Sequence, residues 1–251
     1  MKLKQNWYNA IQIRTSRRAF KKHAISQAKI EQIEDCIHTI NEESGLHIQF
    51  VANGYHFLRG FKASYGLISG CPSVIAMAGN AEDQDLKRKI GYYGEFLLLE
   101  CVSLGLGTCW IGGSYNREEC KKSIRLGESD ELVCIIAVGE VVSVKNLKEL
   151  LISQIGKRKQ TFDELLAEKE STPPLWVNLG IESARIAPSA VNGKPIAYCF
   201  KNNEISAFAA KKNHGSEEID LGISMAHFQL GALQGLHNGQ WVKRDNQYIF
   251  L

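Results

Sequence analysis

The first half of the chain alternates between stretches with apolar residues at helical spacing and short apolar stretches typical of strands. Between Ser26 and Gly45, isoleucines recur every three or four positions, which predicts a helix with one buried face. Residues 82–104 carry the longest pattern of this kind in the first half. The predicted order is a short helix at 7–13, the helix before Gly45, strands at 47–52 and 73–79, the helix at 82–104, a short helix at 117–126 and a strand at 131–142.

The same order of elements recurs in the second half, after a boundary suggested by Ser171-Thr-Pro-Pro174. The predicted elements are a helix at 175–186, strands near 196–201 and 204–210, a long helix at about 216–237 and an apolar hairpin carrying Trp241 and Tyr248–Leu251. The recurrence is one of architecture more than of residue identity. We therefore expect two halves, 1–170 and 171–251, packed as one unit.

Two predicted helices begin at residues that favour helix starts. Ser26 precedes the first-half helix and is a good N-cap residue there. Thr161-x-x-Glu164 has the spacing of a capping box, which predicts a small helix at this point.

Composition and charge limit the classes of partner. The 251 residues are 44% hydrophobic and 23% charged, which suffices for one large core or two closely packed halves. The net charge of +3 is mildly basic, and no stretch interleaves basic and aromatic residues as a nucleic-acid groove would. The longest apolar runs, Phe96–Leu99 and Val133–Val138, are too short to span a membrane, and residues 1–8 lack a signal-peptide core. We expect a soluble, cytoplasmic protein without nucleic-acid or membrane partners.

Cysteine and histidine usage gives no sign of a disulfide framework or a metal site. The seven cysteines form no C-x-x-C pair, and most lie among apolar residues, as small buried hydrophobic side chains do. The seven histidines form no H-E-x-x-H and have no cysteine pair beside them. We expect no metal and a reducing compartment.

Arg14-Thr-Ser-Arg-Arg-Ala-Phe20 is the first stretch with candidate chemistry. A charge run of this kind is usually a solvated turn. The spacing R-x-S-x-R can also place two guanidinium groups and a hydroxyl on one side of an extended segment. Arginine forks bind phosphate oxygens and also hydrogen-bond planar carbonyls, so both interpretations stay open from these residues alone.

Ser189-Ala-Val-Asn-Gly193 is the second such stretch. Pro188 ends the preceding helix, because proline lacks an N–H and disfavours helical dihedrals in the residue before it. Pro195 then leads into the next strand. The corner between them presents hydroxyl, amide and backbone donors, which suits a polar, planar ligand. An ordinary helix–strand connection explains the same residues equally well.

Gly105-x-Gly107 follows the long helix of the first half. In a dinucleotide-binding fingerprint a third glycine would stand where Trp110 is, and the pair would follow a strand instead of a helix. The sequence therefore disfavours a Rossmann site here.

Together these stretches resemble the nitroreductase family of FMN-dependent oxidoreductases. Residues 184–195 resemble the family's A-R-x-A-P-S-x-x-N-x-Q-P, with Lys194 where the family usually has Gln. Residues 14–20 match R-R-S-x-R-x-F at four positions, namely Arg14, Ser16, Arg18 and Phe20. Residues 105–113 look like the family's long helix that ends in G-x-G before an apolar turn. Lys157-x-Lys159 is a looser match to a Lys-x-Arg that holds phosphate.

The resemblance implies an α+β flavoprotein with antiparallel or mixed sheets flanked by helices. Such an enzyme binds FMN and passes a hydride from NADH or NADPH, in a ping-pong cycle, to a quinone, a nitro compound or another small acceptor. Arg14 and Ser16 would meet the phosphate, and Arg18, the catalytic residue, would stabilise negative charge near N1 and O2 of the flavin. The implied cofactor-binding residues are Arg14, Thr15, Ser16, Arg18, Ser64, Tyr65, Trp110, Ile111, Gly112, Gly113, Lys157, Lys159, Pro188, Ser189, Ala190 and Asn192.

The two specific motifs lie in opposite halves, and each occurs once. The second half begins Leu175-Trp-Val-Asn, without R-x-S-x-R, and the first half contains no A-P-S-x-x-N. Nitroreductase-like enzymes are homodimers in which each flavin takes the Pro-Ser loop from one subunit and the arginine segment from the other. By this resemblance the chain is a pseudo-dimer, two subunits fused into one polypeptide with one site kept. One FMN should bind per chain, and a monomer should suffice.

Two alternatives remain within the resemblance. One is a flavoprotein of the same fold with other chemistry, such as reductive dehalogenation or flavin processing. The other is a non-catalytic module that binds flavin or has lost it. A steady-state assay with NADH or NADPH and a quinone or nitroarene separates the non-catalytic module from the oxidoreductase.

Overall fold

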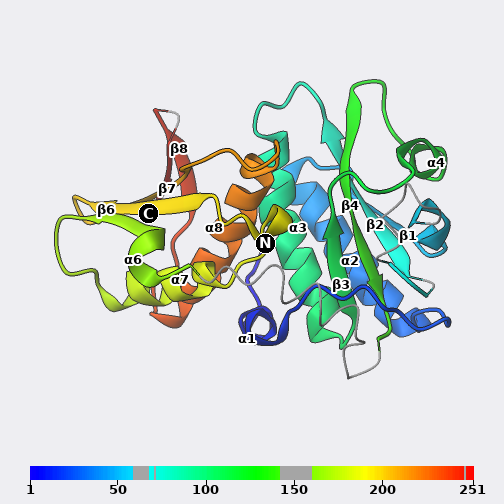
Figure 1. Cartoon of the computed structure of the whole chain (residues 1–251), viewed down its shortest axis with the longest axis horizontal. Helices are drawn as coiled ribbons and strands as arrows, with labels where there is room; N and C mark the ends of the chain where they lie inside the picture. Colours follow the sequence, from blue (N-terminus) through cyan, green and yellow to red (C-terminus); the bar gives the residue numbers. More distant parts are fainter. Residues whose placement is uncertain (59–67, 71, 142–159, 246) are drawn as a thin grey trace. The chain divides into compact units, whose positions relative to one another are not determined.

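The computed structural model describes residues 1–58, 68–70, 72–141, 160–245 and 247–251 (Figure 1). The chain forms two compact units. Unit 1 comprises Met1–Lys2, Gln12–Leu86 and Phe96–Ile155, and unit 2 comprises Leu3–Ile11, Lys87–Glu95 and Gly156–Leu251. The division passes through helices α1 (Gln5–Ile13) and α3 (Leu86–Ser103). The boundary at residues 170 and 171 stays a prediction.

Unit 1 is built on a four-stranded antiparallel sheet in the order β1-β2-β4-β3. Both central strands are buried along most of their length, which is why their sequences are nearly continuous apolar runs. Helix α2 ends at Gly45, whose φ of 70° is the left-handed conformation that glycine adopts without strain. The elements are α2 (Gln27–Ser44), β1 (Gln49–Val51), the 3-10 helix η1 (Gly54–Leu58), β2 (Ser73–Asn80), β3 (Gly107–Ile111), α4 (Arg117–Lys122) and β4 (Asp130–Gly139).

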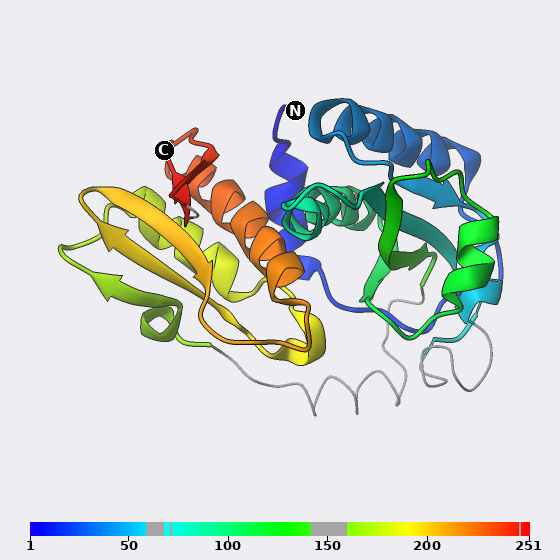
Figure 2. The same cartoon turned by 90° about the horizontal axis from the view of Figure 1, so that it is seen from above.

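Unit 2 is built on a five-stranded sheet in the order β5-β6-β7-β9-β8, in which only the β5–β6 pair is parallel. Figure 2 shows β6 and β7 as a long hairpin. One face of this sheet packs on α7 and α8 through aromatic residues that include Tyr198, Phe200 and Phe228. The elements are α6 (Phe162–Leu165), β5 (Leu166–Lys169), α7 (Leu175–Arg185), the 3-10 helix η3 (Ala190–Asn192), β6 (Ile196–Lys201), β7 (Glu204–Ala209), α8 (Glu217–Gln234), β8 (Trp241–Arg244) and β9 (Gln247–Phe250).

The two units repeat one topology. Each contains a helix, two strands, a long helix and two more strands in chain order. In each sheet the strands lie in the spatial order first, second, fourth, third, as β1-β2-β4-β3 in one unit and β6-β7-β9-β8 in the other. All corresponding pairs are antiparallel. The predicted α+β fold with tandem repeats is therefore confirmed, and β5 is an addition to the edge of the second copy.

Local structure departs from the sequence pattern at a few points. The apolar turn expected within residues 105–113 is instead the strand β3, because Gly107–Ile111 pairs along its length with β4. The Ser26 side chain makes no capping hydrogen bond. The Thr161 capping box is confirmed, with Glu164 N–H donating to Thr161 Oγ1 at 3.2 Å and Thr161 N–H donating to Glu164 Oε2 at 2.8 Å. Among the described helices, none is both long and apolar enough to cross a membrane.

A fully buried polar pair lies in the core of unit 2. Glu95 and His227 are each 0% exposed, with Glu95 Oε1 at 2.9 Å from His227 Nε2. The other imidazole nitrogen, Nδ1, lies 3.1 Å from the Ser183 carbonyl oxygen, so Nδ1 carries a proton and donates it. A proton must also lie between Nε2 and the carboxylate, because two acceptors cannot face each other. The pair joins α3 and α8 to the last turn of α7.

Candidate functional site

The arginine segment, residues 14–20, continues the sheet of unit 1 beyond its last strand. Ser16 forms a parallel bridge with Thr108 of β3, and the Arg17 N–H donates to the Thr108 carbonyl at 2.8 Å. Farther along, the Phe20 N–H donates to the Ser69 carbonyl at 3.0 Å. Because β3 is at the end of the sheet, the bonds to Thr108 place residues 16 and 17 along its outer edge, whereas Phe20 bonds to a residue outside β3.

Most side chains of the arginine segment are half-buried, and two are buried. Arg17 is buried, with 7% of its surface exposed, and its side chain packs against Gly107. Its neighbours Ser16 and Arg18 are half-buried. Phe20, three residues after Arg17, is the other buried side chain of the segment. The sequence did not single out Arg17, because nothing within a run of like residues indicates which one is buried.

The Gly105-x-Gly107 pair is required by the fold itself. Gly105 directly follows α3 and its cap, and its φ of 77° is left-handed. A Cβ on Gly107 would lie 2.4 Å from Val141 Cγ1 and 3.0 Å from Arg17 Cβ. Both glycines therefore serve backbone conformation and packing in unit 1.

Gly112 and Gly113, directly after β3, have a different environment. Both are exposed, and a Cβ on either would meet no described atom within 4 Å. The strand residues before them are less accessible, because Trp110 is half-buried and Ile111 lies in the core. The Ser16–Thr108 bridge brings this stretch and the arginine segment to one edge of the sheet. The open space beside the two glycines leaves the backbone accessible to a flat ligand.

Four residues implied by the resemblance lie outside the described ranges. These residues are Ser64, Tyr65, Lys157 and Lys159. Their assignment to a cofactor site stays a prediction.

The Pro-Ser loop, residues 187–195 of unit 2, has an unusual backbone. Val191, Asn192 and Lys194 have φ values of 44°, 54° and 48°, all in the left-handed region. For a β-branched residue such as valine this conformation is a strained outlier. Val191 is also 76% exposed, so burial of its side chain does not offset the strain. Strain of this kind gathers at functional sites, where the surrounding structure holds it in place.

Lys194 ties this loop to the end of α7. Its ammonium donates to the Arg185 carbonyl at 3.1 Å and to the Ala187 carbonyl at 2.5 Å. The last carbonyls of a helix have no partner within the helix and carry partial negative charge, so a cation there is favourable. The Lys194 N–H also donates to Ser189 Oγ at 3.0 Å. The lysine that stands where the family usually has Gln is thus part of the loop's framework.

Asp220 and Asn213 are supporting residues that the sequence did not reveal. Asp220, at the start of α8, accepts the Ala190 N–H at Oδ1 (2.9 Å) and the Asn213 side-chain amide at Oδ2 (2.6 Å). The same Asn213 nitrogen donates to the Ala190 carbonyl at 2.9 Å. A signal existed, since Asp220 shares its helix face with Ser224 and His227 among apolar residues. Its partners, however, come from other segments of the chain.

The space that the Pro-Ser loop encloses is small. A cavity of about 10 Å³ lies against Pro188, Ser189, Lys194 and Asp220. This volume is on the order of one water molecule. This cavity is therefore too small to hold a flavin ring.

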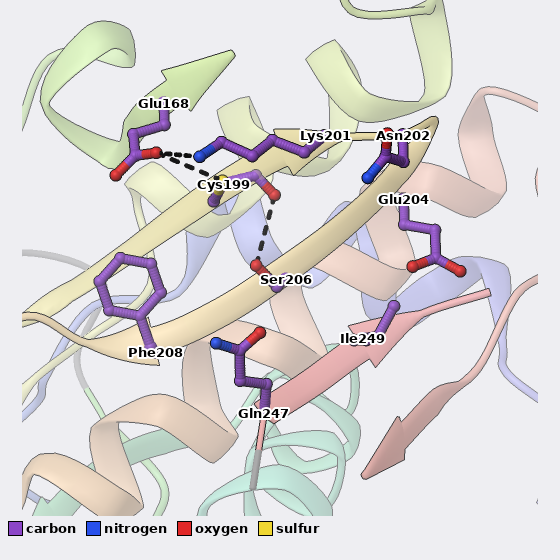
Figure 3. Close-up of a pocket in the computed structure, with 9 residues that line it drawn as sticks. All are labelled: Glu168, Cys199, Lys201, Asn202, Glu204, Ser206, Phe208, Gln247 and Ile249. Atoms are coloured by element: carbon purple, nitrogen blue, oxygen red, sulfur yellow. Dashed lines mark hydrogen bonds and ion pairs between the residues drawn. The ribbon is translucent and has the colours of Figure 1, made fainter. Parts of the chain in front are cut away.

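A larger hollow, of about 430 Å³, lies on the other face of the unit 2 sheet (Figure 3). Its lining comes from alternate positions of β6 and β7 that point away from the helices, such as Cys199 and Ser206. Lys201 pairs there with Glu168 at 2.5 Å, and Glu204 adds a second carboxylate. One ammonium against two carboxylates does not suit a phosphate, and the sequence placed no site residue here.

Comparisons with known proteins agree with this fold. Residues 6–232 match the sequence pattern of a family described as "Putative TM nitroreductase". A solved structure from Thermotoga maritima, described as "a putative nitroreductase", is 19% identical, with a TM-score of 0.64. The alignment covers 100% of this chain and 95% of that one. No curated protein matches the sequence.

Shorter nitroreductases are similar over about half of this chain. An FMN-dependent nitroreductase from Clostridium difficile R20291 is 17% identical, with a TM-score of 0.45, and covers 55% of this chain and 88% of its own. A nitroreductase with bound FMN from Desulfitobacterium hafniense DCB-2 is 20% identical, with a TM-score of 0.44. The alignment covers 57% of this chain and 93% of that one. From the match over residues 6–232, the chain belongs to the TM nitroreductase family.

Proposed function

We propose that this chain is an FMN-dependent NAD(P)H oxidoreductase of the nitroreductase type. The observation that carries the proposal is the pairing of the arginine segment with the edge of β3. This pairing places Ser16 beside Thr108 on the edge strand that leads to the exposed Gly112 and Gly113, and Arg18 follows two residues after Ser16. Cationic and hydroxyl donors beside an open, flat stretch of backbone suit a ligand with a phosphate and a planar ring.

The residues of unit 1 would divide the binding as follows. Arg14 and Ser16, with Thr15 between them, would bind the phosphate, because guanidinium and hydroxyl groups donate to its oxygens. The backbone of Trp110–Gly113 would lie along the ring. Arg18 would hold a fixed positive charge near the pyrimidine edge, and preorganised charge of this kind stabilises negative charge that develops in a reaction.

Unit 2 would contribute the Pro-Ser loop. Pro188, Ser189, Ala190 and Asn192 are half-buried on a corner whose backbone is fixed by Lys194 and Asp220. A fixed corner binds at a lower entropic cost than a loop that must first be ordered. FMN, when bound, accepts a hydride from a reduced nicotinamide and passes it to a small acceptor.

The stoichiometry follows from the number of motifs. The arginine segment and the Pro-Ser loop each occur once in the chain, so we propose one FMN per chain and a monomer that suffices to bind it. Further self-association would then not be needed for binding. Cytoplasmic location and a small-molecule acceptor such as a quinone or nitroarene belong to the same proposal.

The absorbance spectrum of the purified chain, before and after incubation with FMN and gel filtration, tests this function. We expect a flavin spectrum and oxidation of NADH or NADPH when a quinone or nitroarene is added. Arg14→Ala should release FMN, whereas Arg125→Ala, at an exposed arginine of the same unit, should retain it. A chain that stays colourless after incubation would refute the proposal. Bound FMN without turnover would favour a non-catalytic flavin-binding module.

A further inference from the structure

We propose that Asp220 is a positioning residue of the Pro-Ser loop, and that cofactor binding through this loop requires the ionised Asp220 carboxylate. The inference rests on the proposed function, because the loop binds cofactor only within it. The hydrogen bonds that support it belong to the chain without cofactor and can be examined there.

Asp220 fixes both backbone polar groups of Ala190, the N–H directly and the carbonyl through Asn213. Asp220 Oδ1 accepts the Ala190 N–H at 2.9 Å, and Oδ2 accepts the Asn213 side-chain amide at 2.6 Å. Asn213 in turn donates to the Ala190 carbonyl at 2.9 Å. Asp220 is only 3% exposed, so water does not compete well for these bonds. Ala190 is thereby held on both its N–H and its C=O side by α8 and the segment before it.

This clamp lies beside the strained part of the loop. Val191, Asn192 and Lys194 are left-handed, and Ala190 is the last residue before them. Gly193 packs so closely on Asn213 that a Cβ there would lie 2.4 Å from Asn213 Oδ1. Such dihedrals persist only where surrounding contacts determine them. The Asp220–Asn213–Ala190 bonds are contacts of this kind, and they set the direction in which Ser189 and Asn192 point.

The ionisation state of Asp220 decides how strong the clamp is. Burial raises the pKa of this carboxyl to about 6, although the bonds from Asn213 and Ala190 lower it. Among charged groups, Glu217 on α8 raises the pKa and Lys194 in the loop lowers it. The residues Gln160, Ser189 and Ser224, which line the adjoining small cavity, are uncharged.

Protonation weakens the clamp. Both carboxylate oxygens accept hydrogen bonds from N–H donors. A proton added to either oxygen would point at one of these donors or would have to rotate away from it. Hydrogen bonds to a charged acceptor are also about twice as strong as those to a neutral one. The carboxylate is thus the form that holds the loop, even though burial favours the neutral acid.

The decisive comparison is Asp220→Asn against Glu218→Gln. Both remove one negative charge from the first turn of α8, but Glu218 is exposed. Amide hydrogen exchange of residues 186–196 in the full chain without FMN reports the clamp directly. FMN dissociation constants from fluorescence quenching, measured between pH 5 and pH 8, report its consequence for binding.

We expect Asp220→Asn to lose protection of the Ala190 amide and to bind FMN about tenfold to a hundredfold more weakly at pH 7.5, the effect of one hydrogen bond to a charged group. The FMN affinities of Asp220→Asn and Glu218→Gln should become equal as the pH falls below about 6, because Asp220 is then protonated wherever it is present. The FMN phosphate titrates equally in every variant, so the ratio of the two dissociation constants reports the ionisation of Asp220. Asn213→Ala, which leaves the carboxylate in place, should lose part of the same protection.

Unchanged exchange and affinity in Asp220→Asn would overturn the inference. So would a loss of affinity that is the same at pH 5 and pH 8, because a purely structural role has no reason to follow this ionisation. If the unmodified chain binds no FMN at any pH, the proposed function fails. Exchange of the Ala190 amide then decides separately whether Asp220 positions the loop.

Discussion

Lys194 offers a sharp test of how the Pro-Ser loop is held. Lys194→Met removes the ammonium while keeping most of the side chain and the strained backbone. Two charge-assisted hydrogen bonds, to the carbonyls of Arg185 and Ala187, are lost. Each such bond contributes about 1.5–3 kcal/mol where it is buried. Lys194 is only half-buried, so water replaces part of this contribution.

We therefore expect Lys194→Met to lower the free energy of unfolding by about 2 kcal/mol. For a chain of this length, that corresponds to a Tm lower by about 4–8 °C. Lys194→Gln, which introduces the residue usual in the family, keeps an uncharged amide donor group and should lie between wild type and Lys194→Met. The assay is thermal unfolding followed by circular dichroism at pH 7.5, in parallel for all variants.

Lys211→Met is the matched control, because Lys211 is an exposed lysine of the same unit. It should change Tm by less than about 2 °C, as surface substitutions do. The reasoning would be refuted if Lys194→Met were as stable as Lys211→Met. Equal losses in Lys194→Gln and Lys194→Met would show that the donors do not matter and that another property of the lysine does.

Three further predictions concern Arg18, Glu95 and Asp220. Arg18→Ala, saturated with FMN, should be reduced by NADH or NADPH about tenfold to a hundredfold more slowly in stopped-flow measurements, and a rate equal to wild type would remove Arg18 from the mechanism. Glu95→Ala should cost about 3–5 kcal/mol in urea unfolding because it leaves the buried His227 Nε2 without its partner, whereas Glu118→Ala, at an exposed carboxylate, should cost little. Because the pKa of Asp220 is raised in the folded chain, Asp220 adds stability at low pH that is lost as the pH rises from about 4 to about 6. Relative to Glu218→Gln, Asp220→Asn should therefore gain up to about 3 kcal/mol of stability across that window, and a difference independent of pH would contradict the ionisation argument.

Local signals in the sequence predicted most of the fold. Helix and strand order followed from apolar spacing, and Gly45 and Pro188 marked real helix ends because their backbone constraints act within a few residues. The capping box at Thr161 is equally local. The edge strand β5 was missed, because Leu166-Ala-Glu-Lys169 has no β-branched residue and pairs with β6, about thirty residues away.

The sequence predicted the motifs of the candidate site but not the contacts that hold them. The R-x-S-x-R spacing indicated an extended segment, and the segment is extended beside β3. Nothing local indicated that Arg17 would be buried or that Asp220 would hold Ala190, because those contacts join residues far apart in the chain. The role of Lys194 was likewise hidden, since its acceptors are backbone carbonyls, which every residue carries.

The most direct test of the central claim is the flavin content of the chain in solution. Size-exclusion chromatography with light scattering gives the mass of each species, and absorbance gives FMN per chain in the same peak. The proposal predicts one FMN per chain, bound in a monomer as well as in any larger species. Two FMN per chain, or FMN found only in a dimer, would contradict the single set of motifs, and a peak without FMN after reconstitution would contradict the function itself.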